Sequence, residues 1–219
     1  MLFNTPHYIF LFFPLILIIY FGLNRFHLVE AAKWFLVLAS LVFYSWWDLN
    51  NLPILLISII CNWAIVRAIW HANESPNADG SKYLFLGLIF NVSYLGFFKY
   101  YDFLASNVNE AFGFGIPILD VALPLGISFF TLIQIAYLVD AKERLVIGQR
   151  FQNYALFVSF FPHLIIGPIL HHKDMMPQFE KLRTKIFVLE NLAAGLVLFG
   201  IGFAKKVLIA DPLSPYVSL

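Results

Sequence analysis

The sequence is poor in cysteine and in charged residues. It holds one cysteine, Cys61, and only 12% of its 219 residues are Asp, Glu, Lys or Arg. One cysteine excludes an intrachain disulfide, and no cysteine–histidine spacing typical of a zinc site is present. The formal net charge is +1, with no acidic or basic tail, which argues against a nucleic-acid partner. Because soluble domains carry about 25% charged residues, this composition also disfavours a soluble fold.

Apolar residues dominate what is present. They make up 61% of the chain, and the mean hydropathy is +0.80. A helix needs about 20 apolar residues to cross a bilayer. Polar segments separate seven apolar runs: Tyr8–Leu23, Ala32–Trp47, Pro53–Trp70, Tyr83–Phe98, Val121–Val139, Tyr154–Leu170 and Phe187–Ala204. We therefore predict an all-α, polytopic transmembrane protein, in which residues 1–219 form one transmembrane domain of about six to seven membrane segments.

The distribution of Lys and Arg predicts an orientation. Arg25 and Lys33 flank the first connection, the second connection has no basic residue, and Arg67 and Lys82 flank the third. By the positive-inside rule, this alternation places the N-terminus outside the membrane. Met1–Pro6 holds no Lys or Arg, so the first run is expected to be a permanent span rather than a cleaved signal peptide.

The alternation fails at the basic segment His171–Lys185, which strict alternation would place outside. The conflict disappears if the preceding run, Tyr154–Leu170, enters the membrane and returns on the same side. Pro162, Gly167 and Pro168 interrupt a helix within that run. Non-helical backbone at membrane depth requires protein or water around it. We therefore expect a re-entrant segment that lines an internal cavity.

Polar side chains in or beside apolar runs are candidates for function, because they are costly in lipid. The candidates for lining a cavity are Gln134, Asp140, His163, His171 and His172. Structural alternatives stay open: an interhelical hydrogen bond for Gln134, an exposed cap for Asp140 and a buried structural histidine for His163. Neighbouring helical residues point about 100° apart, so His171 and His172 make a poor chelate, and no metal site is predicted. A pocket contact and a solvated loop remain open for this pair.

Two further predictions concern structure alone. Asn62 and Asn91 are expected to form interhelical hydrogen bonds. Lys at the centre of a membrane helix costs about 2.5–3.5 kcal/mol. The adjacent Lys205 and Lys206 therefore predict that the last span ends near Ala204.

Several ordered motifs of the sequence resemble those of the membrane-bound O-acyltransferases. Within that family, they are most similar to the branch of the bacterial alginate O-acetyltransferase membrane subunit. They are Leu123–Thr131 continuing to Gln134 and Tyr137–Asp140, then Phe157–Ile169 and Lys205–Asp211, with Met1–Tyr20, Ser40–Trp47 and Asn91–Tyr100 also similar. The resemblance implies a multi-pass enzyme of the bacterial inner membrane that transfers acetyl groups to hydroxyls of an exported polysaccharide such as alginate. It also implies an acetyl-CoA or acyl-carrier-protein donor, no bound cofactor, and partner proteins of polysaccharide modification in the lipid bilayer.

The resemblance further implies that the family's catalytic histidine, part of a Trp-His segment, lies downstream of the Lys-Lys motif and beyond Leu219. No catalytic residue is therefore assigned here, since the Trp70–His71 pair lies in the wrong place. The chain is expected to be the N-terminal part of a longer enzyme. The alternatives are a non-catalytic membrane scaffold or helper, and a small transporter, which would show inverted repeats or paired broken helices.

Overall fold

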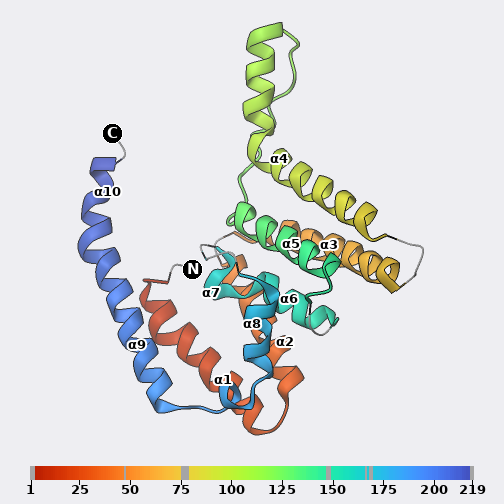
Figure 1. The fold of residues 1–219 in the computed structure, drawn as a ribbon. Helices are drawn as coiled ribbons and strands as arrows, with labels where there is room; N and C mark the ends of the chain where they lie inside the picture. Colours follow the sequence, from red (N-terminus) through yellow and green to blue (C-terminus); the bar gives the residue numbers. More distant parts are fainter. Residues whose placement is uncertain are drawn as a thin grey trace.

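The computed structural model describes residues 3–46, 48–74, 79–146, 149–165, 167 and 170–217. Within these residues every regular element is helical, so the all-α prediction is confirmed (Figure 1). In order, they are α1 (Phe13–Arg25, after a π-helical turn at Tyr8–Phe12), α2 (Val29–Ser45), α3 (Asn51–Glu74), α4 (Ser81–Phe112), α5 (Ile127–Lys142), α6 (Phe151–Ser159), α7 (Phe161–Leu164), α8 (His172–Glu180), the 3₁₀ turn η2 (Leu182–Lys185), α9 (Leu189–Ala204), the π-helical η3 (Lys205–Ala210) and α10 (Asp211–Val217). Trp47 and Pro168, used above as a run end and a helix breaker, lie outside the described residues.

Four helical stretches are long and apolar enough to cross a bilayer: Tyr8–Arg25, Asn51–Glu74, Ser81–Phe112 and Leu189–Tyr216. The shortest has 18 residues. At 1.5 Å per residue it covers about 27 Å, close to the hydrocarbon thickness of about 30 Å. The chain is therefore a multi-pass membrane protein.

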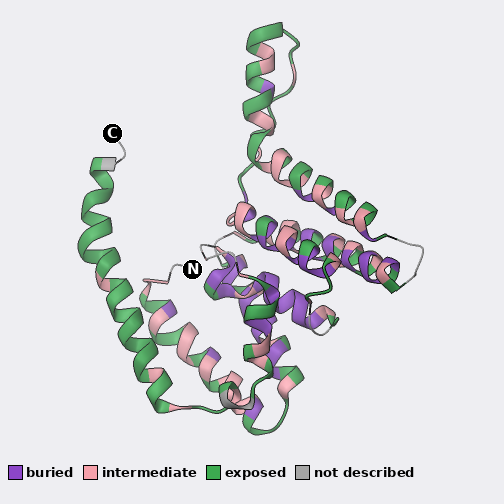
Figure 2. Cartoon of the chain, in the orientation of Figure 1, coloured by how far each residue is buried: buried purple, intermediate pink, exposed green. Residues whose placement is uncertain are grey.

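The buried core lies where the short and middle helices meet. The helix α2 packs against α1 and α6, and α3 packs against α4 and α5. Small residues on α2 such as Ala32 and Ser40, both fully buried, let the neighbouring backbones approach closely. Figure 2 shows this core as buried, whereas α9 and α10 are exposed along most of their length and the far end of α4 is partly exposed.

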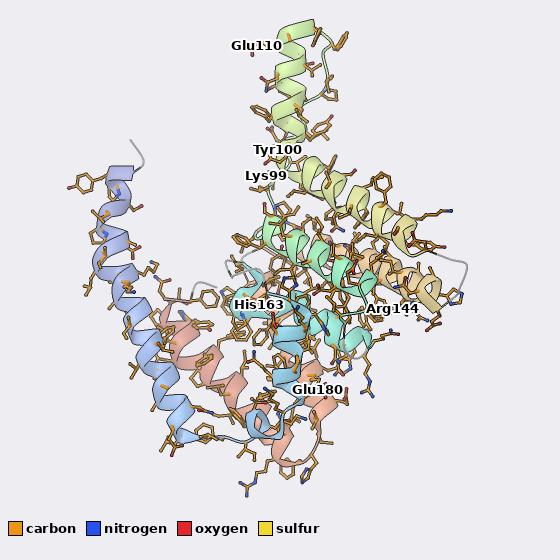
Figure 3. The ribbon with its side chains drawn as sticks, in the orientation of Figure 1. Lys99, Tyr100, Glu110, Arg144, His163 and Glu180 are labelled. Carbon is orange, nitrogen blue, oxygen red and sulfur yellow. The ribbon has the colours of Figure 1, made fainter. Side chains whose placement is uncertain are left out.

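The fourth helix is longer than the sequence predicts. The run was expected to end at Lys99, but α4 continues to Phe112 and changes direction near Lys99 and Tyr100 (Figures 1 and 3). Residues 113–126 then return along its far end without helical structure. We call residues 99–126 the α4 hairpin.

The α4 hairpin is held by hydrogen bonds between its own side chains and backbone. The Asp102 carboxylate accepts the backbone N–H groups of Leu119 and Val121, both at 2.9 Å. The Asn109 side chain bonds the N–H of Ile116 at 2.6 Å and its carbonyl at 2.7 Å. The prediction of a span beginning at Val121 is therefore wrong, since these residues belong to the hairpin and α5 begins at Ile127.

The predicted interruption of Tyr154–Leu170 is confirmed. The helix α6 has nine residues and α7 only four, so α6 covers about 14 Å, half of a hydrocarbon core. The chain turns at Phe160, whose ψ of 111° is not helical. Pro162 falls in the first turn of α7, where a helix tolerates proline.

The interrupted segment returns to the place from which it starts. Arg150, directly before α6, pairs with Glu30 at 3.1 Å. Glu180, at the end of α8, pairs with Lys33 at 2.8 Å. Because Glu30 and Lys33 are one turn apart on α2, residues 150–180 leave and rejoin the same end of that helix. This course is the one expected of a re-entrant segment.

The α-helix α9 ends at Ala204, the residue near which the last span was predicted to end, but helical structure continues beyond it. The helix passes through Lys205 and continues as η3 and α10 to Val217. The Lys206 ammonium lies 2.8 Å from a carboxylate oxygen of Asp211, so this charge has a partner on its own helix. The free-energy cost of placing the two lysines in lipid therefore limits which part of the helix can lie in the bilayer. It does not limit the length of the helix.

Candidate functional site

Two asparagines join α3 to α4 inside the bundle. Asn62 donates to the Asn91 carbonyl oxygen at 3.2 Å, and Asn91 donates to that of Asn62 at 2.6 Å. Both side chains are buried. The structural interpretation of this pair is confirmed, and neither amide is left for a ligand.

Gln134 ties three helices together. Its amide nitrogen donates to the Ser58 hydroxyl on α3 at 2.9 Å, and its carbonyl oxygen accepts from the Tyr154 hydroxyl on α6 at 2.8 Å. The Gln134 side chain is fully buried. These contacts favour the structural alternative for Gln134, a hydrogen bond between helices.

At the C-terminal end of α5, Asp140 is buried rather than an exposed cap. Only 3% of the residue is exposed. The Nδ1 atom of His171 lies 3.2 Å from each of its carboxylate oxygens. The His171 side chain remains half-exposed. The contact therefore joins a side chain at the protein surface to the buried Asp140 at the end of α5. No group of three or more His, Cys, Asp or Glu side chains converges in the described part of the chain.

His172, at the start of α8, is fully buried. Its ring lies edge-on to the rings of Tyr137 and Phe157, with centroids 5.1 and 5.4 Å away. Among the described residues, neither nitrogen of His172 nor the Tyr137 hydroxyl has a hydrogen-bond partner. Burial lowers the pKa of His172 to about 4, although the Asp140 charge acts in the opposite direction. The imidazole is therefore neutral at neutral pH.

His163 lies in α7, well inside the molecule and away from the α4 hairpin (Figure 3). Its Nε2 atom is 2.9 Å from the Phe157 carbonyl oxygen. A carbonyl can only accept, so Nε2 carries the proton, and Nδ1 of the neutral ring is an acceptor. A Cβ atom on Gly167 would overlap the Cβ and backbone of His163. The glycine of the Gly-Pro-Ile motif therefore allows the chain to turn closely around this histidine.

A cavity of about 430 Å³ opens beside His163, and we call it the His163 cavity. Its walls come mainly from α1, α7, α8 and the connections of α8, and most are aromatic or aliphatic. The polar side chains among the lining residues are Tyr20, His163, Asp174, Gln178 and Thr184. Of the five residues predicted to line a cavity, His163 lines this one, whereas Gln134, Asp140, His171 and His172 lie outside its walls.

Four polar residues of the cavity were not predicted from the sequence: Tyr20, Asp174, Gln178 and Thr184. Asp174 and Gln178 are four residues apart on α8, so they lie on the same face, and the Gln178 amide donates to the Asp174 carbonyl at 3.0 Å. The four-residue spacing of Asp174 and Gln178 could have indicated one face of a helix. The polar composition of this segment, however, is also typical of a loop.

A buried ammonium group fixes α8 against the bundle. Lys33 is 3% exposed, and its Nζ lies 2.8 Å from Glu180 on α8 and 3.2 Å from the Asn153 carbonyl oxygen on α6. The hydrogen bond from Lys33 is the main reason that the pKa of Glu180 lies below its ordinary value. The cavity wall formed by α8 is thus anchored to α2.

The arrangement suits a small, largely apolar ligand with one polar group. Most of the wall is apolar, while the His163 imidazole and the exposed Asp174 carboxylate supply an acceptor and a charge. A neutral imidazole acceptor in such a cavity can accept a hydrogen bond from a hydroxyl group and act as a base.

Comparison with known proteins identifies relatives across nearly the whole chain. No family model matches the chain, and no solved structure matches it. A Helicobacter pylori protein named peptidoglycan O-acetyltransferase is 44% identical over 96% of this chain and 45% of its own length. Proteins named probable alginate O-acetylase AlgI from Azotobacter vinelandii and Pseudomonas aeruginosa are each 33% identical over 98% of the chain, covering 42% and 41% of their own lengths. The chain thus spans under half the length of the curated relatives it matches, and over nearly all of its own length its resemblance to the membrane-bound O-acyltransferases is confirmed.

Proposed function

We propose that this chain is part of an integral-membrane O-acetyltransferase that transfers acetyl groups to hydroxyls of an exported polysaccharide. The 44% identity to a protein named peptidoglycan O-acetyltransferase, over 96% of the chain, is the observation that carries the proposal. The relatives named for alginate are 33% identical. The proposed acceptor is therefore a sugar hydroxyl of peptidoglycan rather than of alginate.

The His163 cavity supports a role for this part of the enzyme in holding the acetyl group or its acceptor. An acetyl group is small and apolar apart from its carbonyl, which matches walls of mainly apolar side chains. The proposed donor is acetyl-CoA or an acyl-carrier protein. We assign no catalytic residue to the chain, and His163 is proposed as a cavity residue that orients the bound group.

The proposed location is the bacterial inner membrane, with the N-terminus outside. Contacts between connecting segments support this orientation. Arg150 pairs with Glu30, and the Arg144 guanidinium donates to the Asn73 carbonyl. The connections α1–α2, α3–α4 and α5–α6 therefore lie on one side of the molecule, and these are the connections rich in basic residues. Partner proteins of polysaccharide modification are proposed on the opposite, outer side.

The proposal is tested by deleting the gene that encodes the chain and measuring acetate released by mild base from purified peptidoglycan. We expect the deletion to abolish the released acetate and the whole gene product to restore it. His163→Ala in that gene product is expected to lower the acetate at least about tenfold, as loss of a positioned acceptor does. The control is His71→Ala, because the His71 side chain is 93% exposed and remote from the cavity.

Unchanged acetate after the deletion overturns the proposed reaction. If the deletion lowers acetate while His163→Ala restores it as fully as His71→Ala, the proposed role of His163 and its cavity is overturned. Immunoblots of the membrane fraction ensure that both variants are present at equal levels.

A further inference from the structure

A second cavity, of about 750 Å³, lies between α1 and α9. Figure 1 shows α9 running along the outer side of α1. The wall on the α1 side is formed by Ile9 of the preceding π-helical turn and by Phe13 and Leu17 of α1, which repeat every four residues and so form one stripe of the continuous helical stretch. The α9 wall includes Leu192 and Leu196, with the same spacing. We call this cavity the α1–α9 groove.

The groove is closed at one end and open along its length. The rings of Phe21 and Phe187 meet edge-to-face, with centroids 5.5 Å apart, where α1 ends and α9 begins. Beyond this contact, none of the 16 residues of α9, all of them described, is buried. Both walls belong to stretches able to cross a bilayer. The groove therefore opens toward hydrocarbon and not toward water.

Its dimensions suit one hydrocarbon chain. The α1 wall runs from Tyr8 to Phe21, which corresponds to about 20 Å of helix. That length exceeds one leaflet, about half of the 30 Å hydrocarbon core. An acyl chain lying in the groove would cover the aromatic and aliphatic faces of both helices at once.

The closed end carries an excess of positive charge. Thr184 and Ile186 line the groove there, and Lys185 lies between them in sequence. The segment η2, which holds Lys185, contacts α1, and α1 ends at the exposed Arg25. Lys181 adds a third basic residue. Of the acidic residues of the same region, Asp174 lines the neighbouring His163 cavity together with Thr184, Glu190 lies in the first turn of α9, and Glu180 is already paired with Lys33. A phosphate group would compensate this charge.

We propose that the α1–α9 groove binds one anionic phospholipid, with an acyl chain along α1 and α9 and its phosphate beside Lys185 and Arg25. Basic residues at the end of a groove between membrane helices are a known arrangement for anionic lipid headgroups. The lipid joins α9 to the rest of the bundle, where the contact between Phe21 and Phe187 already holds the residues just before α9. This site is independent of the proposed acetyl transfer.

The test uses the full chain in nanodiscs that contain phosphatidylglycerol with a photoreactive group in one acyl chain. Peptide mapping is expected to find the label on α1 and α9. Gly195→Phe places a ring in the groove, where no atom lies within 4 Å of the glycine's Cβ position, and should abolish the labelling. The control is Gly200→Phe, because Gly200 is equally free of neighbours on the same helix but does not line the groove.

Equal labelling of the two variants, or label spread evenly over all lipid-facing helices, overturns the acyl-chain site. A dimer of the chain in the nanodiscs whose α9 helices carry no lipid label also overturns it. The headgroup is tested by competition with unlabelled phosphatidylglycerol and phosphatidylcholine. Lys185→Gln should lower the preference for phosphatidylglycerol about fivefold, as expected for one basic residue. An unchanged preference overturns the assignment of the phosphate.

Discussion

A methyl group on Gly126 would lie 2.9 Å from the carbonyl oxygen of Leu164. Gly126 ends the Leu123-Pro-Leu-Gly motif, and Leu164 belongs to the motif that carries His163. Next to Gly126, the Leu125 carbonyl accepts the Tyr44 hydroxyl at 2.9 Å. Two motifs that are separate in the sequence therefore form one packed unit behind the His163 cavity.

Gly126→Ala is expected to destabilise the protein more than Gly113→Ala. Both glycines have positive φ angles, +70° and +67°, but nothing lies within 4 Å of a Cβ on Gly113. Each substitution should cost about 1–2 kcal/mol from its backbone conformation, and Gly126→Ala about 1–3 kcal/mol more from overpacking. The measurement is unfolding of the detergent-solubilised variants. Equal losses would contradict the close contact with Leu164.

Gln134→Leu is expected to destabilise the bundle by about 1–3 kcal/mol, because the Ser58 and Tyr154 hydroxyls then lack their partner. Tyr154→Phe added to Gln134→Leu should cost less than Tyr154→Phe alone, because the tyrosine hydroxyl has already lost its acceptor. A double-mutant cycle measures this coupling. Strictly additive effects would show that the 2.8 Å contact between these side chains contributes nothing.

Glu180→Gln is expected to destabilise the protein by about 1–3 kcal/mol, since the buried Lys33 ammonium loses its charged partner. The exposed position of the carboxylate keeps the loss below that of a fully buried pair. Arg150→Gln is the matched control. Its ion pair with Glu30 is exposed on both sides and should contribute at most about 1 kcal/mol.

The effect of Glu180→Gln should also depend on pH. Lys33 lowers the pKa of Glu180 in the folded protein, so the folded state binds a proton less readily than the unfolded chain. The stabilisation is complete above the ordinary glutamate pKa and is lost as pH falls through the lowered value. The stability difference between the two proteins should therefore shrink in acid. A constant difference from neutral pH to pH 3 would contradict this linkage.

His172→Phe is expected to be tolerated or stabilising near pH 7.5, because it removes two buried nitrogens that lack partners. The pKa of His172 is about 4 in the folded protein and 6.5 as its reference value. The unfolded chain therefore binds the proton first, and His172 lowers stability as pH falls from 6.5 toward 4. At its limit the loss is about 3 kcal/mol. Melting curves near pH 7.5 and near pH 4 should show that His172→Phe loses less stability in acid than the unsubstituted protein does. An equal loss of stability in both proteins would contradict the burial of a neutral imidazole.

The features predicted from the sequence are those that a local pattern decides. Apolar runs predict membrane helices, and Pro162 with Gly167 predicts the interruption that separates α6 from α7. The paired amides of Asn62 and Asn91 follow from the rule that buried polar groups in lipid find each other. In each of these cases the residues act on the helix in which they lie, or the free-energy cost of an unpaired polar group in lipid decides the outcome.

The features missed depend on distant partners. Lys33 pairs with a residue 147 positions later, so the sequence indicated only a basic residue at a membrane boundary. Lys99 and the two tyrosines after it are typical of a helix end at the interface, yet α4 continues because its far end has Asp102 and Asn109 to bind the returning chain. The length of α4 is thus set by contacts that exist only after residues 113–126 fold back.

The α4 hairpin has a practical consequence for imaging. Its closing hydrogen bonds lie within residues 101–121, so an insertion at its tip would not disturb the buried core. Gly113 and Gly115, both with positive φ and open surroundings, mark that tip. A rigid soluble domain spliced between them would add mass and asymmetry outside the buried core, which particle alignment in electron cryomicroscopy requires.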